Sequence, residues 1–319
     1  MMTTNPPCVI ADGPLAAEVL ELLAGQVTLL PWSEAERGNA AVQAIYTYGP
    51  PLVDAALLDR LPGVRVISNY GVGVDHIDVL AAASRGIPVG NTPDVLNGAT
   101  ADLAMALLLA AGRRLVEGDR YARSSAFTHY DPGYMLGREI HGQTLGIVGL
   151  GRIGEQVARR ANAFDMTVLY HNRRPRGDAF ARCGAEYVSL DDLLRRSDYV
   201  VLTAPLNDTT RGLIGARELA LMKPTAVLVN VARGAVVDAE ALTRALEAKA
   251  LFAAALDVTD PEPLPRDHRL LQLPNVIITP HLGSATVQTR RRMAEISVEN
   301  LLRGLRGEPL LHQVGREGR

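Results

Sequence analysis

Leu145–Gly154 reads Leu-Gly-Ile-Val-Gly-Leu-Gly-Arg-Ile-Gly. A short apolar run is followed by three glycines and then by a helical pattern that continues to Phe164. In such a turn the first glycine permits a tight bend, the second lets backbone approach a pyrophosphate, and the third lets the helix pack on the strand. The helix start offers unpaired N–H groups to the phosphates. The spacing therefore predicts a dinucleotide-binding turn, with a plain strand-to-helix turn as the alternative, at Gly149, Leu150, Gly151, Arg152, Ile153 and Gly154.

Length and composition are those of an ordinary globular protein. The chain has 319 residues, which suggests about two domains. It is 47% hydrophobic and 21% charged, and its net charge of −2 comes with no basic cluster that would favour a nucleic-acid partner. Cys8 and Cys183 lie far apart, so we expect no disulfide framework, no metal site and a reducing, cytoplasmic location.

The sequence shows no targeting or membrane segment. The start, Met-Met-Thr-Thr-Asn-Pro-Pro, lacks the basic and apolar regions of a signal peptide. The most apolar stretch, Leu103–Ala111, is too short to span a bilayer. We therefore expect no membrane partner.

Two series of alternating strands and helices follow each other along the chain. The first predicts strands over Cys8–Ala11, Val27–Leu30, Ala44–Thr47, Val66–Asn69 and Pro88–Val89 and helices near Leu15–Leu23, Val53–Leu58 and Asp78–Ser84. The second predicts strands over Thr144–Val148, Thr167–His171, Glu186–Val188, Tyr199–Leu202, Ala226–Asn230, Phe252–Asp257 and Val276–Thr279 and helices near Arg152–Phe164, Leu190–Arg195, Asp238–Glu247 and Ala285–Leu305. Such alternation is typical of parallel sheets covered by helices on both faces, so the fold class is α/β and doubly wound.

Two segments connect the series. A long helix is predicted over Ala99–Leu115, and it is apolar on more than one face, which indicates burial on several sides, for example between domains or in a subunit interface. Tyr121–His141 is rich in Gly, His, Tyr and Pro and is predicted to be a surface excursion. In the loop after the fourth strand, Gly71 and Gly73 would let backbone N–H groups converge on an anion, although a flexible turn is an equal interpretation.

The turn after the second strand of the second series bears on the choice of cofactor. A site that prefers NAD usually carries an acidic residue about 20 residues past the glycines, for the ribose 2′-hydroxyl. This chain has Asn172, Arg173 and Arg174 there, and arginine pairs well with a phosphate. We therefore predict NADP(H) as the preferred cofactor, with NAD(H) possible and a solvated basic turn as the alternative interpretation.

Three residues at or just beyond predicted strand ends have the chemistry for hydride transfer to a 2-keto acid. Arg233 can bind a carboxylate, and His281 can protonate a carbonyl oxygen. Glu262 can hold that histidine in one tautomer and keep it protonated, and the prolines on either side of it restrict its backbone. Each residue alone would pass for a surface side chain, but together they predict a catalytic triad.

The chain resembles the D-isomer-specific 2-hydroxyacid dehydrogenases over nearly its full length. The matching stretches are Asn69–Asp78, Asn91–Leu96, Thr100–Ala104, Gly146–Gly154, Val229–Gly234 and Pro280–Ser284. Leu256–Pro265 and the His-Asn-Arg-Arg turn at 171–174 are most similar to the NADPH-using glyoxylate/hydroxypyruvate reductases of that family.

The resemblance implies a Rossmann cofactor domain over residues 98–283 and a flavodoxin-like substrate domain over residues 1–97 and 284–319, with the substrate in the cleft between them. It implies that Arg233 binds substrate, that His281 donates the proton, and that Glu262 pairs with His281. Val72 and Gly73 would donate backbone N–H groups to the substrate. The nicotinamide and ribose would be lined by Thr100, Ala204, Pro205, Thr209, Val231, Ala232, Asp257 and Gly283. A homodimer is implied as well.

These expectations combine into one activity: NADPH-dependent reduction of glyoxylate to glycolate or of hydroxypyruvate to D-glycerate. Three alternatives remain open on the sequence. Two are other dehydrogenases of the family, of the 2-ketogluconate reductase or the phosphoglycerate dehydrogenase type. The third is a dinucleotide-binding regulatory or corepressor protein, which could retain the same three residues.

Overall fold

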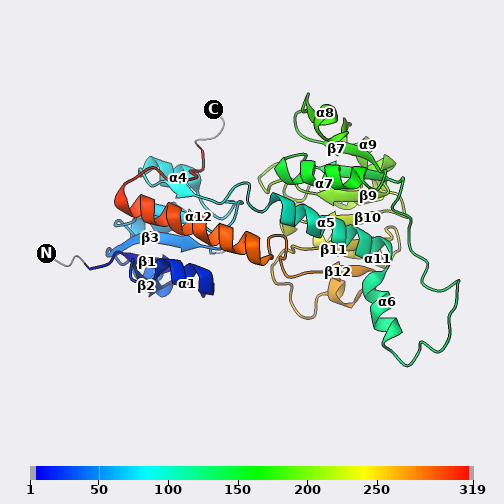
Figure 1. Cartoon of the computed structure of the whole chain (residues 1–319), viewed down its shortest axis with the longest axis horizontal. Coiled ribbons are helices and arrows are strands. Elements are labelled where there is room, and N and C mark those ends of the chain that lie inside the picture. The colour runs from blue at the N-terminus through cyan, green and yellow to red at the C-terminus, as the bar shows by residue number, and fades with distance from the viewer. Residues whose placement is uncertain (1–4, 50, 316–319) are drawn as a thin grey trace. The chain divides into compact units, whose positions relative to one another are not determined.

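The computed structural model describes residues 5–49 and 51–315. The chain divides into two compact units: unit 1 comprises residues 1–96 and 286–319, and unit 2 comprises residues 97–285. These boundaries lie one and two residues from the expected ones. In each unit helices cover a parallel sheet (Figure 1), so the predicted α/β class is confirmed.

Unit 1 contains a five-stranded parallel sheet in the order β2-β1-β3-β4-β5. The strands are β1 (Cys8–Ala11), β2 (Thr28–Pro31), β3 (Val42–Thr47), β4 (Val66–Asn69) and β5 (Val89–Gly90). The helices are α1 (Ala17–Leu23), α2 (Ser33–Arg37), α3 (Ala55–Arg60), α4 (Val79–Ser84) and α12 (Val287–Arg306). α12 and α1 pack together on one face (Figure 1), and α2, α3 and α4 cover an apolar core on the other.

Unit 2 contains a seven-stranded parallel sheet in the order β12-β11-β10-β9-β6-β7-β8. The strands are β6 (Thr144–Val148), β7 (Thr167–His171), β8 (Glu186–Tyr187), β9 (Tyr199–Leu202), β10 (Val227–Asn230), β11 (Ala253–Leu256) and β12 (Val276–Ile278). The chain reverses its direction of winding between β6 and β9. Ligands of open α/β sheets bind outside the carboxyl ends of strands at such a point.

Helices cover both faces of this sheet, as Figure 1 shows. They are α5 (Asn97–Gly112), α7 (Arg152–Asn162), α8 (Ala179–Cys183), α9 (Leu190–Arg196), α10 (Ala216–Leu221) and α11 (Ala239–Glu247), with short 3₁₀ turns at Gly234–Val236 and Arg269–Gln272. A further helix, α6 (Leu115–Ala122), follows α5 and projects from the rest of the unit (Figure 1). Neighbouring strand residues point to opposite cores: Ile147 packs on the α5 and α7 side, and Val148 on the α9 to α11 side. Because both faces are buried, the strands are continuously apolar rather than alternating.

The long helix expected over Ala99–Leu115 is wrong in one respect. α5 ends at Gly112, Arg114 takes a left-handed conformation with φ 53°, and α6 begins at Leu115. A side chain at Gly112 would come within 2.7 Å of the Tyr199 hydroxyl. The end of α5 therefore packs too tightly for a larger residue. The expected burial of α5 on more than one side is confirmed, since it packs on α7, β10 and β11.

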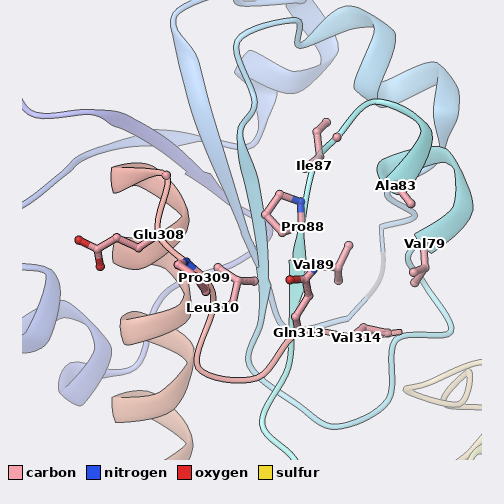
Figure 2. A pocket seen from close by; sticks show the side chains of 12 residues that line it. Val79, Ala83, Ile87, Pro88, Val89, Glu308, Pro309, Leu310, Gln313 and Val314 are labelled. Carbon is pink, nitrogen blue, oxygen red and sulfur yellow. The ribbon is translucent and has the colours of Figure 1, made fainter. Parts of the chain in front are cut away.

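A pocket in unit 1 lies between α4, β5 and the segment after α12, and most of its lining side chains are apolar (Figure 2). The segment covers the edge of the sheet, because the Val314 N–H donates to the Val89 carbonyl at 2.8 Å. None of the residues predicted to bind cofactor or substrate lines this pocket. Within the described residues no helix is long and apolar enough to cross a membrane.

Steric crowding explains why two of the three glycines of the turn in unit 2 are glycines. Gly149 has φ +100°, and a Cβ there would lie 2.5 Å from the backbone nitrogen of Ala204, just past the end of β9. A Cβ at Gly154 would lie 2.7 Å from the Gly149 carbonyl oxygen. A Cβ at Gly151 would meet nothing within 4 Å. The first and third glycines are thus required by the protein's own packing, and the second is not.

This contrast predicts that substitutions at Gly149 and Gly151 affect different properties, the first thermal stability and the second dinucleotide binding. Gly149→Ala should lower the midpoint of thermal unfolding by roughly 4 °C or more, because it adds backbone strain and a clash. Gly151→Ala should change the midpoint by less than about 2 °C but weaken dinucleotide binding. Calorimetry and a fluorescence titration measure the two effects. Equal destabilisation by both variants would contradict the steric explanation.

Candidate active site

Arg233 is positioned by the residue that ends β10. Asn230 is 1% exposed, and its side chain donates to the Arg233 carbonyl at 2.9 Å and accepts from the Ala232 N–H at 3.0 Å. The amide therefore holds the backbone of residues 232 and 233 as it leaves the sheet. The Arg233 guanidinium donates to the Ala232 carbonyl at 2.9 Å, which orients the cation further.

The loop with Arg233 packs directly on the loop with Glu262. A Cβ at Gly234 would lie 2.0 Å from the carbonyl carbon of Thr259, so only glycine permits this approach of two backbones. The Thr259 N–H in turn donates to Oε2 of Glu262 at 3.4 Å. The contact brings the arginine and the carboxylate to the same end of the sheet.

Asp257 holds the turn that carries His281. It lies just after β11 and is 2% exposed. Its backbone carbonyl accepts from the His281 N–H at 2.9 Å, and its carboxylate accepts from the N–H groups of Leu282 at 2.7 Å and Gly283 at 2.8 Å. The Thr279 hydroxyl donates a third hydrogen bond to the carboxylate, at 2.6 Å. His281 has φ +56°, an unusual conformation for this residue, and these bonds keep it there.

His281 and Glu262 form a hydrogen-bonded pair, with Nδ1 and Oε1 2.8 Å apart. Burial has the largest influence on the pKa of Glu262 and raises it, but the hydrogen bond and charge of His281, the Thr259 N–H and the charge of Arg233 together lower it. Glu262 is therefore ionised and accepts, Nδ1 donates, and Nε2 is the nitrogen that can give up a proton. Because the pKa of Glu262 is lowered in the folded protein, the pair stabilises the fold fully when the pH is above the ordinary pKa of glutamate. This stabilisation is lost as the pH falls through the lowered pKa of Glu262.

Several of the residues predicted to bind the cofactor lie close together. Ala204 touches Gly149, and a Cβ at Gly283 would lie 3.2 Å from the Asp257 carboxylate and 3.3 Å from Thr100. Val231 and Ala232 are both 8% exposed, whereas Pro205 and Thr209 lie on an exposed loop. The Thr209 N–H and hydroxyl both donate to the Asn207 side chain, at 2.9 and 2.7 Å.

The glycine turn fits a dinucleotide. The space around Gly151 would be filled by a Cβ, and the N–H groups of Ile153 and Gly154 begin α7 without intrahelical acceptors. No cluster of His, Cys, Asp or Glu suited to a metal occurs in residues 5–49 and 51–315.

The Asn172–Arg174 turn lies beside the glycine turn. The Asn172 side chain accepts from the Leu150 N–H at 2.6 Å and donates to the Leu150 carbonyl at 3.3 Å. Asn172 therefore pins the glycine turn. Arg173 and Arg174 are exposed, and neither guanidinium has a hydrogen bond or ion pair within the part of the chain that the structure describes.

A charged cluster that the sequence pattern does not predict lies behind this turn. Glu155, in the first turn of α7, is 5% exposed, and its carboxylate lies 2.7 Å from Arg159, 2.9 Å from Arg182 and 3.6 Å from Arg176. Arg176 also donates to the Leu150 carbonyl at 3.3 Å. Of these three ion pairs, only that of Glu155 with Arg159 has the four-residue spacing that a helical pattern reveals.

Known proteins show where this chain belongs. The sequence model of the D-isomer specific 2-hydroxyacid dehydrogenase, NAD binding domain, matches residues 105–283. A glyoxylate reductase from Pyrococcus furiosus is 46% identical over 271 residues, which are 84% of this chain and 80% of that protein. A glyoxylate reductase from Aeropyrum pernix is 47% identical over 278 residues, 86% of this chain and 83% of that one.

Solved structures of similar proteins indicate the same family. The TT0316 protein from Thermus thermophilus matches with a TM-score of 0.87 and 45% identity, over 96% of this chain and 99% of that one. An NADPH-dependent glyoxylate/hydroxypyruvate reductase from Sinorhizobium meliloti, in complex with NADP and malonate, matches with a TM-score of 0.87 and 34% identity, over 98% and 97% of the chains. The chain is an oxidoreductase that binds a nicotinamide dinucleotide, and it belongs to the D-isomer specific 2-hydroxyacid dehydrogenase family.

Proposed function

We propose that this enzyme uses NADPH to reduce small 2-keto acids, glyoxylate to glycolate and hydroxypyruvate to D-glycerate. The observation that carries the proposal is the His281–Glu262 pair, 2.8 Å apart, in the same loop cluster as Arg233. Relatives named glyoxylate reductase and the Sinorhizobium meliloti glyoxylate/hydroxypyruvate reductase support the choice of substrates. A cytoplasmic location is part of the proposal, and the free thiols of Cys8 and Cys183 are compatible with it.

Each residue has one task in this mechanism. When bound, NADPH supplies the hydride that adds to C2 of the keto acid. Arg233 pairs with the substrate carboxylate, and Val72 and Gly73 of unit 1 donate backbone N–H groups to the substrate. His281 transfers the proton on Nε2 to the carbonyl oxygen as the C–H bond forms, which yields the hydroxyl. Glu262 stabilises the charged imidazole until that transfer.

Two variants test these tasks. His281→Ala should reduce kcat for glyoxylate by about 10²-fold or more, since the general acid is lost. Arg233→Ala should mainly damage use of the keto acid and leave NADPH binding nearly unchanged. Steady-state assays and a fluorescence titration with NADPH measure both. Near-normal turnover by His281→Ala, or loss of NADPH binding in Arg233→Ala, would refute the corresponding assignment.

The preference for NADPH rests on the turn at 172–174. Arg173 and Arg174 are exposed and make no hydrogen bond or ion pair within the described residues, so both can reach a 2′-phosphate. Asn172, which occupies the place of the usual acidic residue, has its amide committed to Leu150. No carboxylate at that position would repel the phosphate.

Replacing both arginines by alanine should raise the Kd for NADPH by about tenfold or more and change the Kd for NADH by less than about twofold. Arg244→Ala is the matched control, because Arg244 is an exposed arginine of unit 2 whose nearest carboxylate, on Glu240, is 3.8 Å away. If the unaltered enzyme had a lower KM for NADH than for NADPH, the proposed cofactor preference would be wrong.

We also propose a homodimer, and α6 with the segment after it supports the proposal. α6 buries none of its residues, and it projects with the following loop from the rest of unit 2 (Figure 1). Large apolar side chains stay exposed there: Leu115 at 55%, Phe127 at 50%, Tyr130 at 81%, Tyr134 at 52% and Leu136 at 69%. Contiguous exposed apolar groups mark protein interfaces.

Analytical ultracentrifugation should give a mass twice the 34.2 kDa of one chain. Leu136→Glu should shift the enzyme toward the monomer, because it places a charge in the interface. Leu80→Glu, at a leucine of unit 1 that is 83% exposed, should leave the mass unchanged. A monomeric wild-type enzyme, or equal effects of the two changes, would exclude this interface.

A further inference from the structure

Asn69, the last residue of β4, holds the loop that follows this strand through hydrogen bonds. It is 0% exposed, and its Nδ2 donates to the Gly71 carbonyl at 2.9 Å and to the Gly73 carbonyl at 2.8 Å. Because both neighbours are acceptors, the nitrogen of the amide must face them. The other atom of the amide, Oδ1, is buried and has no hydrogen-bond partner within the described residues.

A second amide holds the carbonyl between these two. Asn91, just after β5, donates through Nδ2 to the Val72 carbonyl at 2.9 Å. Asn91 is itself anchored, since its carbonyl accepts from the buried Asn300 side chain at 3.0 Å. Three consecutive carbonyls, of Gly71, Val72 and Gly73, are therefore bound by asparagine side chains from two neighbouring strand ends.

The positions of the carbonyls fix the directions of the amides that follow them. In a trans peptide the C=O and the next N–H point in opposite directions. The N–H groups of Val72 and Val74 thus point away from Asn69, and the N–H of Gly73 points away from the Asn91 amide. None of these three N–H groups has an acceptor within residues 5–49 and 51–315.

We propose that Asn69 and Asn91 are positioning residues that hold the Val72, Gly73 and Val74 amides ready for the anionic group of the substrate. The proposal rests on the proposed function, because it takes that anion to be the carboxylate of the 2-keto acid. The buried, unpaired Oδ1 supports it: such an atom costs stability, and native proteins keep few of them. The loop exchanges that stability for a fixed set of donors. The proposal also adds the Val74 N–H to the two donors, of Val72 and Gly73, that the family resemblance implies.

Asn69→Leu and Asn91→Leu test the proposal, with Asn275→Leu as the matched control. Leucine removes the donor at similar volume, and in Asn69→Leu it removes the unpaired oxygen as well. Asn275 is also a partly buried amide that donates to a backbone carbonyl, that of Phe252 at 3.2 Å, but it lies just before β12 in unit 2.

Asn69→Leu should raise the KM for glyoxylate by about tenfold or more, with kcat changed less and the Kd for NADPH within about twofold of the wild-type value. Asn91→Leu, which loses one bond, should show a smaller rise in KM, and Asn275→Leu should show none. A purely structural role would lower the unfolding temperature and leave KM unchanged.

The outcomes separate the two proposals. If wild-type enzyme reduces no 2-keto acid, the proposed function fails. If it does reduce glyoxylate but folded Asn69→Leu and Asn91→Leu keep the wild-type KM, the positioning role fails on its own. Should Asn69→Leu not fold, Asn91→Leu decides, since Asn91 is only partly buried and contributes a single bond.

Discussion

The candidate site depends on the hydrogen bonds that the Asp257 carboxylate accepts. This residue is buried at the end of β11 and accepts hydrogen bonds from the Thr279 hydroxyl and from the N–H groups of Leu282 and Gly283, while its own carbonyl accepts from His281. The backbone of His281 has φ +56°, which is unfavourable for histidine, and these hydrogen bonds hold it in that conformation. The direction of the imidazole, and hence its pairing with Glu262, follows from this turn.

The same device recurs at other strand ends. Asn69 at the end of β4, Asn172 just after β7 and Asn230 at the end of β10 each hydrogen-bond through the side-chain amide to the backbone of a nearby loop. Loops at the carboxyl ends of parallel strands carry the chemistry of these folds but have few backbone partners of their own. A polar side chain rooted in a rigid strand supplies the missing partners. The precision of the site thus comes from residues that need not touch a ligand.

Much of the fold follows from local pattern. The apolar runs predicted most strands to within a residue or two, and glycine spacing located the turn before α7, because both depend on neighbours in the chain. The break between α5 and α6 was missed, because the left-handed residue that makes it is Arg114, a residue type that does not mark a helix end by itself. Residue chemistry placed Arg233, Glu262 and His281 in one site. It could not reveal that Asp257 holds the histidine turn, or that Arg176 and Arg182 converge on Glu155.

The contact of Gly234 with Thr259 has a consequence for how such an enzyme can change. Two backbones meet there at a distance that excludes any side chain, so the loop with Arg233 stays against the loop with Glu262 only while residue 234 is glycine. The relative position of Arg233 and Glu262 then depends on backbone packing at the carboxyl end of the sheet as well as on their side chains. A substitution that changes the range of substrates without disturbing this contact is therefore expected at positions other than 234.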